Sequence, residues 1–274
     1  MRLRITTWNV NSIRIRLDLL ARVVAHCRPD VLCLQETKVD NGRFPYDAVR
    51  ALGFPHIHVH GQKTWHGVAT LSKWPLADGR ALAWCGVADC RHTVCFLPGA
   101  LELHNLYVPA GGDVPDPEIN PRFRHKLEML EALTGYFVAR RGDGARLLLA
   151  GDLNIAPLPT DVWNHRALLK VVSHTPVEVE ALERLRRAYD FVDAVRARIP
   201  PEVKVFTWWS YRARDWRKSN RGRRLDHIWL APALAPHLVA VEVWAEARGF
   251  DRPSDHVPVT VELDLPDAWF HGDG

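Results

Sequence analysis

The sequence predicts an α/β domain in which two β-sheets pack together and helices cover their outer faces. Strand-like segments recur along all 274 residues, and helical patterns flank these segments without strictly alternating with them. No linker or low-complexity tract interrupts the chain, so residues 1–274 are expected to form one domain. Hydrophobic residues make up 47% of the chain, which is enough to fill a substantial core.

Nine segments have the apolar runs or the alternation that indicate β-strands. They are residues 3–10, 30–35, 67–72, 101–108, 146–150, 205–209, 225–230, 239–244 and 257–263. The segment ARLLLAGDLN, residues 145–154, shows the pattern clearly, because three leucines precede Gly151 and Asp152. An apolar run that ends at turn residues is typical of a buried strand.

Four segments have helical spacing. In the first, an apolar stripe from Ile13 to Val24 follows Ser12, a candidate N-cap, and Pro29 is expected to end the helix near Cys27. The others are expected after Pro121 and over residues 177–188 and 191–199.

Neither a membrane span nor a secretion signal is indicated. The apolar runs fall far short of the ~18 residues that a membrane helix needs. The N-terminal sequence MRLRITTWNV leads directly into a strand-like segment, without a signal-peptide core. We therefore expect a cytoplasmic protein that does not bind membranes.

The five cysteines form no CxxC pair, which predicts reduced thiols and gives no sign of a disulfide framework. A zinc site built from Cys85, Cys90, Cys95 and His92 is an open alternative. These four residues lie in alternating, strand-like sequence, where buried thiols are common.

The basic residues are concentrated in one stretch. Residues 212–224 contain seven arginines and lysines and one acidic residue, although the net charge of the whole chain is only +4. Trp208, Trp209, Tyr211 and Trp216 lie within or just before this stretch. Basic side chains interleaved with aromatic ones suit the phosphates and bases of a nucleic acid. The alternative is a solvated loop.

Polar residues gather at the ends of the strand-like segments. They are Asn9, Asn11, Gln35, Glu36, Tyr107, Asp152, Asn154, Asp226, Ser254, Asp255 and His256. If the strands pack side by side, these positions converge into one pocket. Their carboxylate and amide oxygens suit Mg²⁺ or Mn²⁺.

Such a set matches the needs of phosphodiester hydrolysis, in which water attacks in line and the non-bridging oxygens need positive charge. Glu36 would hold the metal, and Asp152 with Asn154 would orient and deprotonate the water. His256 would contact the phosphate, with its tautomer fixed by Asp226.

Eight motifs resemble those of the exonuclease III family of bacterial apurinic/apyrimidinic (AP) endonucleases. They are TWNVNSIRIR (7–16), LQETKVD (34–40), HGQKTWHGVATLSK (60–73), LYVPAGG (106–112), GDLNIAP (151–157), FTWWSYR (206–212), RRLDHIWLA (223–231) and PSDHVPV (253–259). The resemblance runs in order from residue 3 to about residue 265. It implies a four-layered αββα sandwich, in which two mixed sheets are flanked by helices.

The resemblance also implies roles for individual residues. Those in the catalytic set are Tyr107, Asp152, Asn154, Asp226 and His256. Those near the metal are Glu36, Asn9, Asn11 and Asp255. Those expected to contact DNA are Trp208, Tyr211, Arg212, Arg217, Lys218, Arg221 and Arg223. The implied activity is Mg²⁺-dependent cleavage of duplex DNA 5′ to an abasic site, with 3′-5′ exonuclease activity, by a monomer.

Two positions depart from the family pattern. Ala110 stands where an Asn or Gln often contacts phosphate, and the amides of the following Gly-Gly pair are candidates to replace that contact. Arg223 stands where an apolar pocket residue is common. Two alternatives remain open: a phosphoesterase acting on small molecules or lipid headgroups, and a non-catalytic DNA-binding module. The full set of carboxylates argues against the second, since a buried acidic cluster is costly without a metal.

Overall fold

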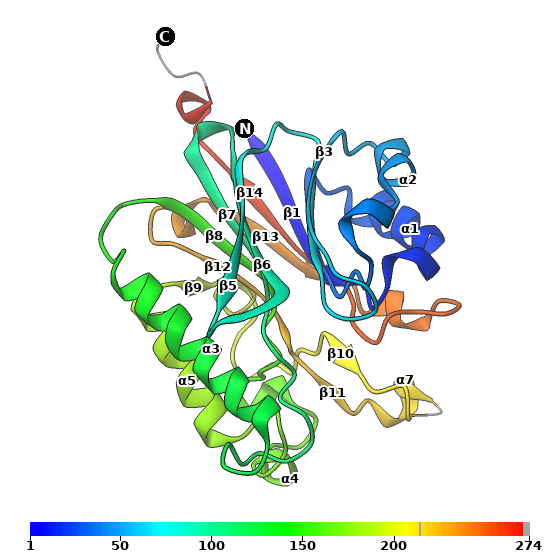
Figure 1. Ribbon diagram of the computed structural model, residues 1–274, viewed down its shortest axis with the longest axis vertical. Coiled ribbons are helices and arrows are strands. Elements are labelled where there is room, and N and C mark those ends of the chain that lie inside the picture. The colour runs from blue at the N-terminus through cyan, green and yellow to red at the C-terminus, as the bar shows by residue number, and fades with distance from the viewer. Residues whose placement is uncertain (214, 271–274) are drawn as a thin grey trace.

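Two six-stranded sheets face each other in the structure, a computed structural model that describes residues 1–213 and 215–270 (Figure 1). The first sheet has the order β13 (Leu238–Val243), β14 (Val259–Asp264), β1 (Arg2–Asn9), β2 (Val31–Gln35), β4 (Val68–Ser72) and β3 (His56–His60). The second has the order β5 (Ala77–Trp84), β6 (Val87–Leu97), β7 (Leu101–Tyr107), β8 (Arg146–Asp152), β12 (Asp226–Leu230) and β9 (Val192–Asp193). Both sheets are mixed, because β1 pairs with β2 and β7 with β8 in parallel.

An apolar core fills the space between the two sheets. Ile5 and Val261 from the first sheet pack with Leu103, Leu148 and Ile228 from the second, and all five are buried. Alternation along each strand directs these side chains inward, so each sheet also has an outer face that must be covered.

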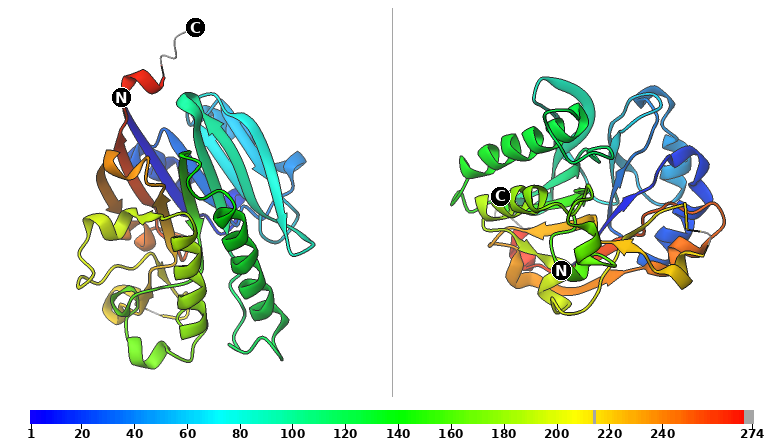
Figure 2. Two further views of the ribbon diagram at one scale, coloured as in Figure 1. Left: turned by 90° about the vertical axis from the view of Figure 1, so that its left-hand side faces the viewer. Right: turned by 90° about the horizontal axis from the view of Figure 1, so that it is seen from below.

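Helices cover both outer faces. On the first sheet lie α1 (Leu17–Cys27) and α2 (Tyr46–Ala51), and on the second lie α3 (Pro121–Val138) and α5 (Pro176–Ala188). Figure 2 shows α3 and α5 side by side along the second sheet. The predicted four-layered αββα sandwich is therefore confirmed. Among the described residues, no helix is both long and apolar enough to cross a membrane.

Five shorter elements lie along the chain between the helices and strands of these layers. They are α4 (His165–Leu168), α6 (Ala194–Arg198), β10 (Trp208–Trp209), α7 (Trp216–Ser219) and β11 (Gly222–Arg223). In Figure 1 the β10–β11 ribbon and α7 project below the sheets.

Several local expectations were wrong. Ser12 caps no helix through its side chain, because it has a φ of 83° before a short 3₁₀ turn and the first helix begins only at Leu17. The strand expected over 205–209 is reduced to Trp208–Trp209, and the helix expected over 191–199 begins at Ala194 because the preceding pair joins β12.

A close approach between β7 and β8 requires Gly151. A Cβ atom at this position would lie 1.8 Å from the carbonyl oxygen of Leu106. The two strands run in parallel, with Tyr107 directly beside Asp152. The glycine therefore brings these two polar side chains to the same edge of the sheet.

Candidate active site

The polar residues predicted from strand ends do converge, and both sheets contribute to the convergence. Asn9 ends β1, Glu36 follows β2 and His256 precedes β14 in the first sheet. Tyr107, Asp152 and Asp226 lie at the ends of β7, β8 and β12 in the second. Hydrogen bonds between these side chains join the two sheets directly.

An imidazole lies between two buried carboxylates. Nδ1 of His256 lies 2.8 Å from Oδ2 of Asp226, and its Nε2 lies 3.6 Å from Oδ2 of Asp152. Burial alone would lower the pKa of His256, but the two carboxylates outweigh it and raise this pKa to about 10. The two carboxylates therefore favour the protonated ring and fix its orientation.

Asp152 is fully buried and held from two sides. The backbone N–H of Asn154 donates to its Oδ1 over 2.9 Å, and the side-chain amide of Asn9 donates to its Oδ2 over 2.9 Å. Burial raises the pKa of Asp152 to about 7; His256 acts in the opposite direction, and Asp226 adds to the rise. This carboxyl can therefore exchange a proton near neutral pH.

Three side chains contact the carboxylate of Glu36. The Tyr107 hydroxyl and the Asn9 amide each donate to its Oε1 over 2.9 Å, and the Lys38 ammonium lies 2.8 Å from its Oε2. Burial opposes ionisation, but Lys38, Asn9 and His256 together outweigh this effect and lower the pKa of Glu36. Burial, followed by the charges of Glu36 and Asp152, raises the pKa of Tyr107 well above its usual value.

The donor set fits a hard divalent cation. Lys38 also donates to Oδ1 of Asn11 over 2.5 Å, so a positive charge already lies between Glu36 and Asn11. Oδ1 of Asp226 is buried and has no hydrogen-bond partner among the described residues. The carboxylate of Glu36 and the amide oxygen of Asn11 suit a hard divalent cation, because such ions bind oxygen ligands and retain several waters.

Two residues predicted near the metal have other partners in the structure. Asn9 turns its NH₂ group toward Glu36 and Asp152, while its oxygen accepts the backbone N–H of Asn11. In this arrangement Asn9 orients the carboxylates, and its place near the metal stays a prediction. Asp255 accepts hydrogen bonds from Asn11 and from the indole of Trp208.

A cleft of about 900 Å³ opens beside these groups. Trp208, Leu225 and Arg223 line it together with Glu36 and His256. The guanidinium of Arg223 lies 5.2 Å from the centre of the Trp208 ring.

Arg223 was expected to contact DNA, but the structure makes it part of the pocket wall. Its Nη1 donates to the carbonyl of Val172 over 2.9 Å and to the hydroxyl of Ser173 over 2.7 Å. Arg223 thus uses two hydrogen bonds to hold itself against the protein. The family resemblance had implied an apolar side chain at this position.

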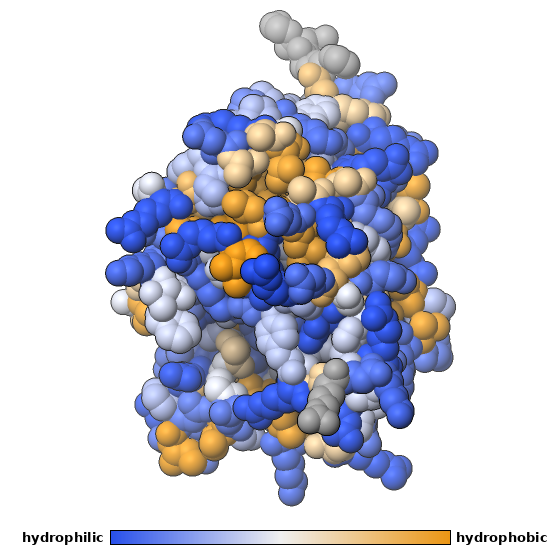
Figure 3. Space-filling view, turned by 90° about the vertical axis from the view of Figure 1, so that its right-hand side faces the viewer, coloured by the Kyte–Doolittle hydropathy of each residue, from blue (hydrophilic) through white to orange (hydrophobic). Residues whose placement is uncertain are grey.

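Four basic residues expected to bind DNA are exposed, and two of them, Arg212 and Arg221, line the cleft. The four are Arg212, Arg217, Lys218 and Arg221. Tyr211 is also exposed, and its hydroxyl is anchored because it donates to the carbonyl of Pro253 over 2.8 Å. Figure 3 shows mainly hydrophilic side chains over the lower part of the molecule, where Figure 1 places α7.

Fewer basic side chains of residues 212–224 are available to contact DNA than the composition suggested. Arg224 is completely buried and forms a bidentate pair with Asp161, and a further hydrogen bond of 2.8 Å joins it to Asp193. It therefore belongs to the core. Arg214, which counted toward the same charge, lies outside the described residues.

Lys126 was missed and supports the catalytic loop. Its fully buried ammonium donates to the carbonyl of Asn154 over 2.9 Å and to that of Ala110 over 3.3 Å, and it pairs with Glu178. The sequence could have indicated a buried lysine here, because Lys126 lies three residues after Phe123 on the apolar stripe of α3. A lysine at a core position has to be paired.

The loop that includes Ala110 is fixed from both sides. Besides the contact from Lys126, Asn120 donates its amide to the carbonyl of Gly111 over 2.9 Å. Gly111 and Gly112 have φ values of 91° and 72°, which favour glycine, and Gly112 lines the cleft.

The zinc ligand set considered from the sequence is wrong. Cys95 is buried between the sheets, whereas Cys85 is exposed at the turn between β5 and β6. His92 is buried and hydrogen-bonds His104 over 2.9 Å.

The fold and the site together define a phosphodiester-cleaving hydrolase, because an acid–base centre lies at the edge of an αββα sandwich beside a cleft. Residues 6–256 match the Endonuclease/Exonuclease/phosphatase family, and the chain belongs to that family. Within it, the chain is a DNA repair nuclease of the exonuclease III type, because it is similar over nearly its whole length to an exodeoxyribonuclease III and to an AP endonuclease.

The relatives match over nearly their whole length. Exodeoxyribonuclease III of Haemophilus influenzae is 30% identical, over 95% of this chain and 100% of that protein. The structure of an AP endonuclease from Archaeoglobus fulgidus has a TM-score of 0.88 and 30% identity, covering 96% of this chain and 100% of its own. The structure of a 3′ phosphatase from Neisseria, bound to a product DNA hairpin, has a TM-score of 0.86 and 32% identity, with the same coverage.

Proposed function

We propose that the protein cleaves duplex DNA at the phosphodiester 5′ to an abasic site, with the help of Mg²⁺ or Mn²⁺, and that it also removes nucleotides from 3′ ends. The observation that carries this proposal is the group formed by Asp152, His256 and Asp226 at the edge of a cleft lined by Trp208. The similar proteins are named as an AP endonuclease, a 3′ phosphatase and an exodeoxyribonuclease.

Residues for the attack of water on the phosphate are in place. Asp152, oriented by Asn154, accepts a proton from the attacking water as the new P–O bond forms. The His256 imidazolium donates to a non-bridging oxygen of the phosphate and stabilises its growing charge. The bond from phosphorus to the 3′ oxygen breaks, the leaving oxygen takes a proton from solvent, and Asp152 later releases its proton to solvent, so that the products are a 3′-hydroxyl and a 5′-deoxyribose phosphate. A divalent ion bound by Glu36 and Asn11 would supply further positive charge to the phosphate oxygens.

The cleft suits a nucleotide turned out of the duplex. The Trp208 indole and Leu225 offer apolar surface to a sugar that carries no base, and base extrusion is least costly at such a site. Arg223 adds hydrogen-bond donors to the same wall. Arg212 and Arg221 are exposed at the cleft, and Arg217 and Lys218 are exposed on α7, where they can meet the phosphates of the duplex.

Cleavage assays with three duplexes test the proposal: one with an abasic analogue, one with a plain nick and one with a 3′-phosphate, each with Mg²⁺ or with EDTA. We expect incision at the abasic site with Mg²⁺ and none with EDTA. The protein could instead cleave a small phosphoester at a rate that does not depend on salt, and leave DNA uncut. That result would show that the substrate is a small molecule and not DNA. The monomeric state and the cytoplasmic location stay predictions.

A further inference from the structure

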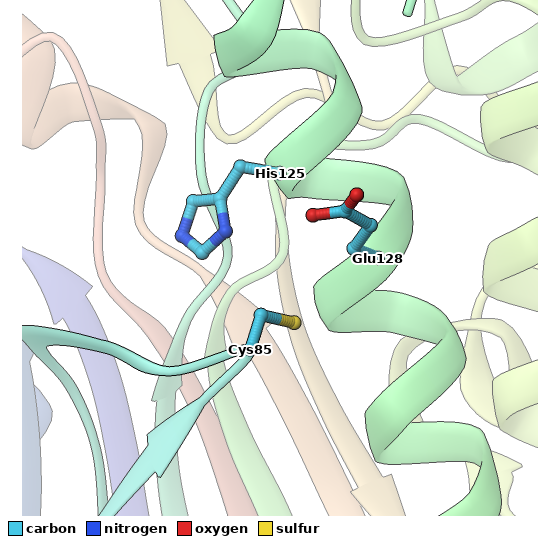
Figure 4. Close-up of side chains that lie close together, drawn as sticks. All are labelled: Cys85, His125 and Glu128. Carbon is cyan, nitrogen blue, oxygen red and sulfur yellow. The ribbon is translucent and has the colours of Figure 1, made fainter.

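Three side chains with metal-binding atoms meet on the surface, away from the catalytic cleft. They are Cys85 in the β5–β6 turn and His125 and Glu128 on α3, and Figure 4 shows them gathered between the turn and the helix. One ligand atom from each lies within 4.8 Å of those of the other two. His125 and Glu128 are three residues apart and so share one face of the helix.

The backbone holds Cys85 in position. Trp84 pairs with Val87, so Cys85 and Gly86 form a two-residue hairpin turn, with φ values of 55° and 70°. Such turns favour Asn, Asp and Gly, and a cysteine is an unusual occupant of the first position. Its exposed thiol and the exposed carboxylate of Glu128 make no hydrogen bond or ion pair with the described residues.

A second carboxylate orients the imidazole. Nε2 of His125 lies 3.3 Å from Oδ2 of Asp89, which is itself paired with Arg91. This contact leaves Nδ1 of His125 for a ligand. A carboxylate behind a histidine that binds metal fixes its tautomer and makes the ring a better donor.

We propose that Cys85, His125 and Glu128 bind one Zn²⁺ ion, with water as the fourth ligand. Thiolate and imidazole select Zn²⁺ over Mg²⁺, and a tetrahedral ion with bonds of roughly 2.0–2.3 Å requires the three atoms to close up by only about 1 Å. The thiol proton is released to the solvent on binding. This ion differs from the catalytic one, whose candidate ligands include no cysteine.

The bound ion would join the β5–β6 hairpin to α3. Lys126, the next residue after His125, extends to the carbonyl of Asn154 in the catalytic loop. The zinc site is therefore a clamp on the helix that supports this loop, and its role is structural.

Cobalt spectroscopy tests the site separately from the catalytic centre. Co²⁺ is added to the full chain in excess Mg²⁺, and a thiolate-to-cobalt charge-transfer band is expected to saturate at one equivalent. Cys85→Asn should abolish this band while keeping the fold, because Asn tolerates the positive φ of the turn. Cys90→Ser is the matched control and should retain it.

Zinc affinity and thermal stability provide a second measurement. Zn²⁺ should raise the melting temperature of the wild type but not that of Cys85→Asn, and Glu128→Gln should weaken Zn²⁺ binding by about tenfold or more. Incision of abasic DNA should be unchanged in Cys85→Asn. Absence of the charge-transfer band in the wild type, or its persistence in Cys85→Asn, would overturn the proposal.

Discussion

Asp152 and Asp226 lie directly opposite each other on the neighbouring antiparallel strands β8 and β12, and the imidazole of His256 lies against both carboxylates. Two buried acids at adjacent positions repel each other unless a positive charge is shared between them. The structure supplies that charge from the other sheet, because His256 precedes β14.

Replacing Asp152 tests the acid–base centre. Asp152→Asn keeps the size of the side chain but cannot accept the proton of the attacking water, so incision of abasic DNA should slow by about 10²–10⁴-fold. Single-turnover cleavage at saturating Mg²⁺ measures this loss. Asp47→Asn, at a fully exposed position on α2, is the control and should cleave normally. Full activity in Asp152→Asn would exclude Asp152 as the base.

The raised pKa of Asp152 predicts an acid limb in the pH profile. Burial brings this pKa to about 7, and only the ionised form accepts a proton, so the cleavage rate should rise as the pH increases through about 7. Single-turnover rates across the pH range, at constant ionic strength and saturating Mg²⁺, give the profile. A rate that stays constant from pH 5 to pH 8 (about three units, ample for one group) would contradict this assignment.

Lys38 is expected to compete with the metal. Its ammonium lies 2.8 Å from Glu36, so Lys38→Met removes a positive charge from the cation position and should lower the Mg²⁺ concentration for half-maximal cleavage. An ion pair of about 1 kcal/mol corresponds to a change of up to about fivefold. Glu36→Gln should shift the requirement in the opposite direction. A higher Mg²⁺ requirement in Lys38→Met would show that the lysine assists metal binding.

The exposed basic residues of α7 should influence how DNA binding depends on salt. Arg217 and Lys218 are exposed on α7, and replacing both by Ala should lower the slope of log affinity against log salt by about 2. Fluorescence anisotropy with a labelled duplex measures the slope. The double variant Arg184→Ala/Arg187→Ala on α5 serves for comparison, and an equal effect there would indicate non-specific attraction.

Arg224 should matter for folding and not for DNA binding. Arg224→Met leaves Asp161 and Asp193 without their shared buried partner, which should lower the free energy of unfolding by about 3–5 kcal/mol. Arg212→Met, at an exposed position, should change it by less than about 0.5 kcal/mol. Urea titration measures the free energy of unfolding of the two variants. Equal values would show that the ion pairs of Arg224 do not stabilise the fold.

Residues at strand ends could be predicted from the sequence because apolar runs fix where strands stop. Asp152 illustrates this, since the leucines before it can only form a buried strand and the turn after it can only lie at the sheet edge. Less regular elements could not be predicted. Most of β5 is exposed and lacks an apolar alternation, and β3 alternates histidines with apolar residues that are only half-buried.

Charge in the sequence was a weaker guide than apolar pattern. Arg223 and Arg224 look alike in a basic run, yet one lines a pocket and the other pairs with acids in the core. Their partners come from distant parts of the chain, so only the folded structure distinguishes them. Lys126, by contrast, was detectable as a charge on the apolar stripe of a helix.

The reacting groups are divided between the two sheets, and this division has a consequence for the heated enzyme. A slip of about 1 Å between the layers would separate Asp226 from His256 while leaving every strand intact. Cleavage should therefore fade before circular dichroism registers any melting, which makes activity the more sensitive gauge of thermal damage.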